Sequence, residues 1–253
     1  MQGHRKVSAS RCSSFADTPR MDITRTKRGL RLSQHGVVIS ELRTTAGPTH
    51  SVFDLLAALI AVLPPVGQSE GRIGVLGFAG GGMMAPLQQL GVTTVIDSVD
   101  LDRAGYDLFR RHCPDWTARV RWQQADALVW LRAQPPEFSL LMDDLSISRN
   151  GDVVKPDLCW DALPALMQQR LRPGGCAVFN LLPPPDGRWN PGLARIVARF
   201  GAARVIDLEE FQNRILVVGA RLPSARQLGA ALRAALRSLR SRQAGRLRVR
   251  SLV

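Results

Sequence analysis

Short β-rich runs alternate with helix-length segments between residues 72 and 219, and few folds accommodate such an alternation. Strands joined through helices pair in parallel, and helices then bury both faces of their sheet. The sequence predicts seven strands, at residues 73–77, 94–99, 120–123, 138–143, 177–182, 204–207 and 215–219. It predicts five helices between them, at residues 84–90, 103–112, 127–133, 158–171 and 193–200. We therefore expect an α/β fold with a mostly parallel seven-stranded sheet.

A small β/α element precedes this alternation. Residues 37–42 are typical of a strand, and residues 52–63 are an apolar run of helix length that Pro64 and Pro65 end. Even this run is far shorter than the roughly 20 residues that span a bilayer, so no transmembrane segment is expected. We assign residues 34–66 to the small element and residues 67–220 to the main domain.

The positive charge of the chain lies at its two ends. The formal net charge is +13. The first 33 residues hold eight Lys/Arg and two acids, and residues 221–253 hold nine Arg and no acid, which leaves −2 for the body between them. Nucleic acid or an acidic surface is therefore expected to bind, if at all, through the ends. Residues 1–33 are predicted to be a basic, disordered extension, and Met21 is an alternative start.

The C-terminal segment carries four leucines at helical spacing: Leu228, Leu232, Leu236 and Leu239. Arginines lie between them, so the pattern predicts an amphipathic helix. This helix either docks on the body or binds an acidic membrane, RNA or a second subunit. Residues 246–250, which alternate Arg with Leu or Val, are expected to be frayed.

Cysteine and histidine give no sign of a metal or a disulfide framework. The four cysteines form no C-x-x-C pair, which favours a reducing cytoplasm. His35, His50 and His112 do not show metal-ligand spacing, and no metal is expected.

The residues that carry chemistry fall where predicted strands end. The segment Gly77-Phe78-Ala79-Gly80-Gly81-Gly82 follows the first strand of the main domain, as a tight turn or as a close approach of backbone to a ligand requires. Asp100 closes the second strand, where a carboxylate can accept both hydroxyls of a ribose. Asp126 closes the third, where it can meet an adenine amino group or cap the next helix.

Two adjacent carboxylates, Asp143 and Asp144, close the fourth strand. Adjacent strand residues point to opposite faces, so only one of them is expected to face a ligand. The segment Leu171-Arg172-Pro173-Gly174-Gly175 then ends a helix and turns into the fifth strand. The following segment, residues 179–185, is either a wall of an acceptor pocket or only the close of that strand.

These motifs in this order resemble the class I S-adenosylmethionine-dependent methyltransferases, and more closely their spermidine synthase-like branch. The resemblance covers residues 34–220 and implies a Rossmann-like fold in which residues 67–220 bind S-adenosylmethionine or its decarboxylated form. It implies that Gly77 and Gly81, with Phe78 beside them, border the adenosyl group. Asp100, followed by Leu101, would hold the ribose, and Asp126 with Ala127 would meet adenine. The resemblance also implies that Asp144 occupies the position of the aspartate that, in aminopropyltransferases, helps to deprotonate the attacking amine.

Three positions depart from the polyamine-making members of this branch. Gly80 stands where they have an acid that binds the donor's amine, and Ile147 stands in place of a second acid of the amine site. The tyrosines expected near the amine are missing, since Tyr106 is the only tyrosine of the chain.

Three functions are compatible with these residues. The first is methyl transfer from S-adenosylmethionine to a small-molecule acceptor, with Asp144 as the orienting or general base. The second is aminopropyl transfer from decarboxylated S-adenosylmethionine, as in spermidine synthesis, which the three departures oppose. The third is a non-catalytic scaffold that acts through the Arg-rich ends. Family members often pair, so a homodimer is also an option.

Overall fold

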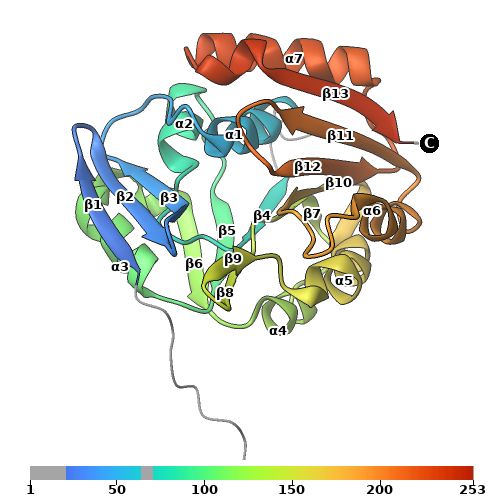
Figure 1. The fold of residues 1–253 in the computed structure, drawn as a ribbon, viewed down its shortest axis with the longest axis horizontal. Helices are drawn as coiled ribbons and strands as arrows, with labels where there is room; N and C mark the ends of the chain where they lie inside the picture. Colours follow the sequence, from blue (N-terminus) through green and yellow to red (C-terminus); the bar gives the residue numbers. More distant parts are fainter. Residues whose placement is uncertain (1–20, 64–70, 253) are drawn as a thin grey trace, which may run out of the picture.

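The computed structural model describes residues 21–63 and 71–252, and an α/β sandwich makes up most of them (Figure 1). The strands of its central sheet are β4 (Arg72–Leu76), β5 (Ile96–Asp100), β6 (Val120–Gln124), β7 (Phe138–Asp143), β10 (Leu171–Leu181), β11 (Ala202–Leu208), β12 (Arg214–Gly219) and β13 (Leu247–Leu252). Their order is β13-β11-β12-β10-β7-β4-β5-β6. The five strands from β10 to β6 are parallel, whereas β12 and β13 pair antiparallel with their neighbours. The expected mostly parallel sheet is confirmed, with eight strands in place of seven.

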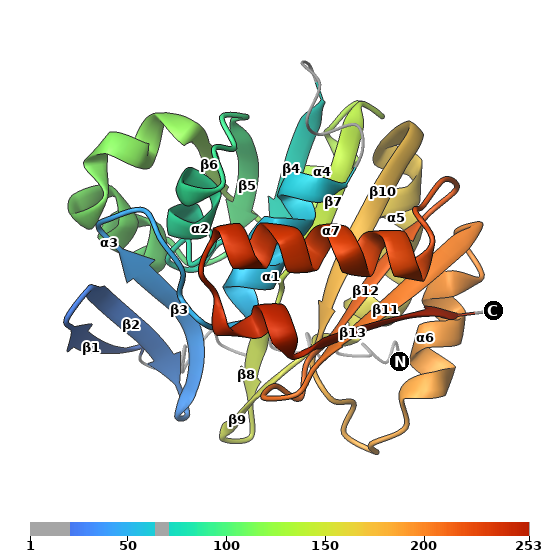
Figure 2. The same cartoon turned by 90° about the horizontal axis from the view of Figure 1, so that it is seen from above.

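Helices cover both faces of this sheet (Figure 2). They are α1 (Val52–Val62), α2 (Met84–Gln89), α3 (Ala104–His112), α4 (Ala127–Arg132), α5 (Ala162–Arg170), α6 (Trp189–Val197) and α7 (Ala225–Ser238). One hydrophobic core joins the sheet to α1, α2, α3 and α7, and a second joins its other face to α4, α5 and α6. Both cores draw on the central strands, and all six residues of β7 are buried. Continuous apolar strands of this kind need cover on both faces.

The N-terminal part of the described chain is a three-stranded antiparallel sheet of β1 (Asp22–Thr26), β2 (Gly29–Gln34) and β3 (Val37–Arg43). The prediction of disorder was therefore wrong for residues 22–33; residues 1–20 lie outside the described part. Leu30 and Leu32 alternate with polar residues along β2 and are buried in the first core together with Leu42. Period-two alternation, rather than overall hydrophobicity, makes this basic segment a strand.

The C-terminal helix α7 docks on the body. Leu228, Leu232 and Leu236 are buried against the first core, and a capping box of Ser224 and Gln227 begins the helix. The docked alternative is thus confirmed. Within η3 (Arg242–Gly245), which follows α7, the Gln243 amide nitrogen donates to the His50 carbonyl oxygen at 3.0 Å.

Residues 246–250 were wrongly predicted to be frayed. Most of this segment belongs to β13, which pairs with β11 at the edge of the sheet. Its alternating arginines meet acids: the Arg250 guanidinium lies 3.1 Å from Asp207, and Arg248 lies 3.9 Å from Glu209. The backbone ladder and these ion pairs order a segment whose composition suggested none.

Several boundaries differ from the predicted ones. The helix predicted over residues 158–171 consists of a 3-10 turn, η2 (Asp157–Trp160), and α5. The helix predicted over residues 193–200 is α6, which begins four residues earlier and ends three residues earlier. β10 begins at Leu171 instead of residue 177, because a register shift between Leu171 and Cys176 takes the Pro-Gly-Gly turn into the strand. Pro64 and Pro65, expected to end α1, lie outside the described residues. In the part of the chain that is described, no helix is long and apolar enough to cross a membrane.

Candidate functional site

A cavity of about 760 Å³ lies at the carboxyl ends of the parallel strands. The chain runs outward from β4 to β5 and β6, then returns to β7 on the other side of β4. Ligands of open α/β sheets bind at such a reversal of strand order. Seven predicted site and turn residues line the cavity: Gly77, Ala79, Asp100, Leu101, Asp126, Ala127 and Asp144. The structure thus brings together residues that lie up to 67 positions apart in the sequence.

The glycine-rich turn after β4 fits tightly between its neighbours. Gly77 has a φ of +88°, and a Cβ there would lie 2.7 Å from the Asp144 carbonyl oxygen. From the other side Gly105 of α3 approaches so closely that its Cβ would lie 2.2 Å from the Ala79 carbonyl oxygen. These contacts require glycine at both positions, and they let the backbone of the turn border the cavity.

Asp100 holds this turn in place. Its Oδ2 accepts hydrogen bonds from the backbone N–H groups of Phe78 at 2.9 Å and Ala79 at 2.8 Å, and its Oδ1 accepts one from Asp102 at 3.2 Å. A carboxylate offers about four lone-pair sites, so Asp100 retains capacity for a ligand hydroxyl. Its position in the cavity wall is compatible with both roles.

Asp126 begins helix α4, as one of its two predicted roles requires. Its Oδ1 accepts a hydrogen bond of 3.0 Å from the Val129 N–H. Asp126 and Ala127 also line the cavity, so capping does not withdraw this carboxylate from a ligand. On the same wall Leu101 is 63% exposed and offers apolar surface.

Phe78 and Gly81 do not line the cavity. Phe78 is buried in an aromatic cluster, with its ring centroid 5.2 Å from that of Phe109 and 5.8 Å from that of Tyr106. A Cβ at Gly81 would lie 2.7 Å from the Phe78 ring. Both residues therefore shape the turn from behind.

The three departures from polyamine-making members have a clear structural setting. A Cβ at Gly80 would lie 2.3 Å from Leu42 and 2.6 Å from Leu32, so this position faces apolar side chains. Tyr106 of α3 stacks on Trp122 of β6, with ring centroids 4.5 Å apart, and does not line the cavity. Ile147, in contrast, does line it.

Asp144 lies at the end of β7, at the centre of the site. Its Oδ1 accepts a hydrogen bond of 2.6 Å from the Asn180 amide, whose Oδ1 in turn accepts one of 2.8 Å from Asn213. Burial raises the pKa of Asp144 to about 6, against the opposing effects of the Asn180 hydrogen bond and the Lys155 charge. Such a carboxyl exchanges a proton near neutral pH.

Asn180 and Asn213 are functional candidates that the sequence did not assign. Both line the cavity, as does Leu182. The segment of residues 179–185 was left open between a pocket wall and a strand end, and Asn180 is both the second-last residue of β10 and part of the wall. The only sequence signal for this role was the polar amide of Asn180 within the apolar run of residues 177–182.

Asp143 points away from the cavity, as the alternation of strand side chains predicts. It is buried and pairs with Lys155, whose Nζ lies 2.9 Å from the Asp143 Oδ1. The same Nζ donates to the Leu145 carbonyl oxygen at 2.8 Å. The Asp143 charge keeps the pKa of Lys155 above its ordinary value despite burial.

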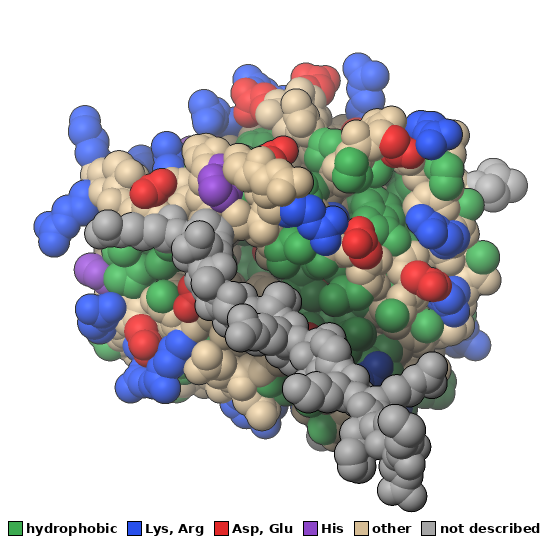
Figure 3. Space-filling view, turned by 60° about the horizontal axis from the view of Figure 1, so that its bottom comes forward, with side chains coloured by type: hydrophobic (Ala, Val, Ile, Leu, Met, Phe, Trp, Pro, Cys, Tyr) green, Lys and Arg blue, Asp and Glu red, His purple; other side chains and the backbone are tan. Residues whose placement is uncertain are grey.

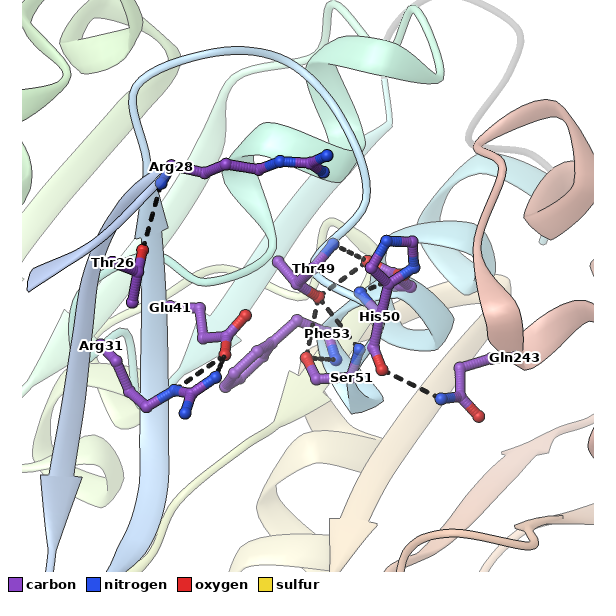
Figure 4. Close-up of polar contacts among 10 residues, drawn as sticks. Thr26, Arg28, Arg31, Glu41, Thr49, His50, Ser51, Phe53 and Gln243 are labelled. Carbon is purple, nitrogen blue, oxygen red and sulfur yellow. Dashed lines mark hydrogen bonds and ion pairs between the residues drawn. The ribbon is translucent and has the colours of Figure 1, made fainter.

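A polar network shapes the wall where α1 begins (Figure 4). The buried Asp54 carboxylate accepts hydrogen bonds from the backbone N–H groups of Thr49 at 2.7 Å and His50 at 2.9 Å. Ser51 caps α1 through the Phe53 N–H, and Ser51 and Phe53 both line the cavity. Since Gln243 holds the His50 carbonyl, the C-terminal segment supports this wall.

The fold is a spermidine synthase-like class I S-adenosylmethionine-dependent methyltransferase fold. A probable spermidine synthase from Corynebacterium glutamicum has a TM-score of 0.71 and 18% sequence identity, over 91% of this chain and 86% of that chain. Human methyltransferase-like protein 13 in complex with SAH has a TM-score of 0.56 and 19% identity, over 75% of this chain and 90% of that chain. Spermidine synthase from Thermotoga maritima has a TM-score of 0.61 and 14% identity, over 82% of this chain and 71% of that chain. A scan against protein-family models finds no match, and neither does a search of curated proteins.

Proposed function

We propose that this chain is a transferase that moves a methyl group from S-adenosylmethionine to a small acceptor, with Asp144 as the general base. The observation that carries the proposal is the position of Asp144. This carboxyl, with a pKa of about 6, lies in one cavity with the glycine-rich turn and Asp100. General-base catalysis is efficient when the pKa of the base lies near the working pH.

The donor would lie along the wall formed by the loops after β4, β5 and β6. Asp100 would accept the ribose hydroxyls, Asp126 would meet the adenine amino group, and Leu101 and Ala127 would contact the adenine ring. The backbone at Gly77 would border the adenosyl group because no Cβ intervenes. Four carboxylates and no Lys or Arg line the described cavity, which complements the positive charge of a sulfonium.

When bound, the donor supplies a methyl carbon attached to an excellent leaving group. The chain must therefore mainly position the acceptor in line and remove its proton. Asp144 accepts this proton, and Asn180 and Asn213 fix the orientation of the Asp144 carboxylate.

Aminopropyl transfer is the weaker alternative. The Gly80 position faces Leu32 and Leu42, Ile147 replaces an acid, and Tyr106 does not line the cavity. A polycationic acceptor would then have Asp144 as its only carboxylate on the acceptor side, and each missing partner of a desolvated cation costs about 1–3 kcal/mol.

The oligomeric state and the role of the basic ends stay predictions. The β13 arginines Arg248 and Arg250 already pair with acids of the same chain. Contact with nucleic acid or an acidic surface would therefore more readily involve other exposed arginines of the C-terminal segment, such as Arg226 and Arg237 of α7 and Arg240 and Arg242 after it.

Calorimetric titration with S-adenosylmethionine, its decarboxylated form and methylthioadenosine tests the proposal. We expect the carboxylated donor to bind, and Asp100→Ala to abolish its binding. Asp107→Ala serves as the matched control, since Asp107 lies outside the cavity wall and pairs only with Arg103 on the surface of α3. Preference for the decarboxylated donor would favour aminopropyl transfer, and binding of none of the three would favour the scaffold hypothesis.

A further inference from the structure

The cavity has two chemically different walls. Its four carboxylates, at residues 100, 102, 126 and 144, all end or closely follow the strands β5, β6 and β7. A second part of the lining comes from β3, the start of α1, and the hairpin of β8 (Ile147–Arg149) and β9 (Asp152–Val154). Its main side chains are apolar: Val37, Val38, Ile39, Phe53, Ile147 and Val153. Figure 3 shows hydrophobic side chains gathered in a hollow of the surface.

In the described part of the chain, this second wall exposes apolar surface. Val37 is 38% exposed and Val38 is 39% exposed. Together with Leu101 they are three of the five large hydrophobic side chains that are exposed in the described part of the chain. A concentration of exposed apolar side chains around one cavity marks a binding surface.

The polar groups of the cavity that face both walls are few. Asp144 and Asn180 both line the cavity and are joined by a hydrogen bond, and Asn213 is hydrogen-bonded to Asn180. Gln34 and serines 51, 146 and 148 add polar groups but no charge. The side chains of this wall offer no counter-charge to a cationic body, which would have Asp144 alone on the acceptor side, whereas an uncharged apolar body would release water from the wall.

We propose that the acceptor is an uncharged, flat apolar molecule that carries one phenolic hydroxyl, with its body on the wall of Val37, Val38 and Ile147 and its hydroxyl at Asp144. This inference rests on the proposed function. An amine of ordinary basicity would be cationic at neutral pH, which the wall disfavours. An aliphatic alcohol is far less acidic than a phenol, whose pKa is about 10, and a carboxylate deprotonates it less readily.

The transfer step balances without a further reactant. The phenolic oxygen forms a bond to the methyl carbon, and the S–CH₃ bond breaks with its electron pair going to sulfur. The hydroxyl proton passes to Asp144 and from there to water. The products are an aryl methyl ether, the thioether S-adenosylhomocysteine and a proton.

Three small probes test the charge and shape of the acceptor: 2-naphthol, 2-naphthoate and putrescine. Each is titrated by calorimetry into the full chain, with and without S-adenosylhomocysteine. We expect 2-naphthol to bind at least tenfold more tightly than either charged probe. Tighter binding of putrescine or 2-naphthoate would overturn the proposal.

A matched pair of substitutions locates the bound probe. Val38→Asp places a carboxylate on the apolar wall, and Val129→Asp places one on α4 at a valine that is 60% exposed and does not line the cavity. Since both valines are exposed, both variants should fold. Val38→Asp should weaken 2-naphthol binding at least tenfold and Val129→Asp less than twofold. Equal effects of the two variants would overturn the assignment of this wall.

The same titrations separate this inference from the proposed function. If 2-naphthol binds and depends on Val38 while no donor binds, the apolar site stands and the transferase proposal fails. If the donor binds and depends on Asp100 while putrescine binds better than 2-naphthol, the transferase stands and the phenolic acceptor fails. Asp144→Leu should remove the preference for 2-naphthol over 2-methoxynaphthalene, and an unchanged preference would remove Asp144 from the hydroxyl site.

Discussion

Asp144→Asn is expected to stabilise the protein at neutral pH while it abolishes group transfer. Burial raises the pKa of this carboxyl from 3.8 to about 6, so the folded chain resists its ionisation more than the unfolded chain does. Asparagine carries no charge, and its Oδ1 can still accept the hydrogen bond that Asn180 donates to Asp144 at 2.6 Å. The substitution therefore removes the penalty of ionisation and keeps the contact.

The size and pH dependence of the effect follow from the two pKa values. A pKa difference of one unit corresponds to about 1.4 kcal/mol, so the ionised wild type is destabilised by at most about 3 kcal/mol. Water in the cavity screens the charge, and we expect about 1–2 kcal/mol above pH 7. Since the folded pKa is the higher one, the stabilising effect of the protonated carboxyl is complete below about pH 4 and is lost as the pH rises through 6.

Urea unfolding of the wild type and the variant at pH 5, 6.5 and 8 measures this difference. The free energy of unfolding of Asp144→Asn, relative to the wild type, should increase with pH and level off above about pH 7. Asp115→Asn, at an exposed carboxylate of η1 (Pro114–Arg119), is the control and should show no such trend. A variant less stable than the wild type at pH 8, or a difference that does not change with pH, would refute the argument.

Four further expectations concern the base, its support, the turn and the C-terminal helix. If Asp144 accepts the acceptor's proton, a pH–rate profile should rise through an apparent pKa near 6. Lys155→Met should leave Asp143 charged and buried without its partner at 2.9 Å, and lower the free energy of unfolding by about 3–5 kcal/mol in urea; the double variant with Asp143→Leu should recover most of it. Gly105→Val should displace the glycine-rich turn, because even a Cβ would lie 2.2 Å from the Ala79 carbonyl oxygen, and calorimetry should show the loss of nucleotide binding. Leu232→Ala should destabilise the protein by about 2–5 kcal/mol in thermal unfolding if α7 is part of the core, and an effect near zero would contradict its docking.

The parallel sheet could be predicted because its information is local. Strands such as β7 are apolar along their whole length, and helix-length segments separate them, so the period and spacing of the sequence suffice. The residues at the strand ends then meet by topology alone. Asp100 and Asp144 belong to one cavity because parallel strands bring their carboxyl ends to one edge.

The two ends could not be predicted because their order depends on partners elsewhere in the chain. β2 alternates Leu30 and Leu32 with polar residues, but β1 and β3 complete its sheet and α1 and α2 provide its core. β13 needs β11 for its backbone hydrogen bonds and Asp207 for its arginine. Composition averages over such pairings, so both segments were taken for disorder.

The roles of single residues depended on directions that the sequence does not specify. Phe78 and Gly81 belong to the same turn as Gly77, yet Phe78 faces the aromatic cluster. Asn180 faces the cavity because β10 has the register that places Phe179 opposite Asp143. A one-residue change in that register would exchange the two faces, and no local pattern of the sequence excludes such a change.

The two adjacent carboxylates at the end of β7 have different surroundings: Asp144 lines the cavity, and Asp143 is buried in an ion pair. Asp143 faces inward and holds Lys155, which also binds the Leu145 carbonyl, so the ion pair closes the segment of residues 145–155 on the sheet. That segment carries Ile147 and Val153, which belong to the apolar wall. Breaking a buried ion pair leaves a charge without its partner and costs much free energy. The pair of Lys155 and Asp143 therefore holds the β8–β9 hairpin against the end of β7, next to Asp144. A contact buried outside the cavity thereby sets the position of this wall relative to Asp144, so substitutions at Ile147 or Val153 leave that support in place.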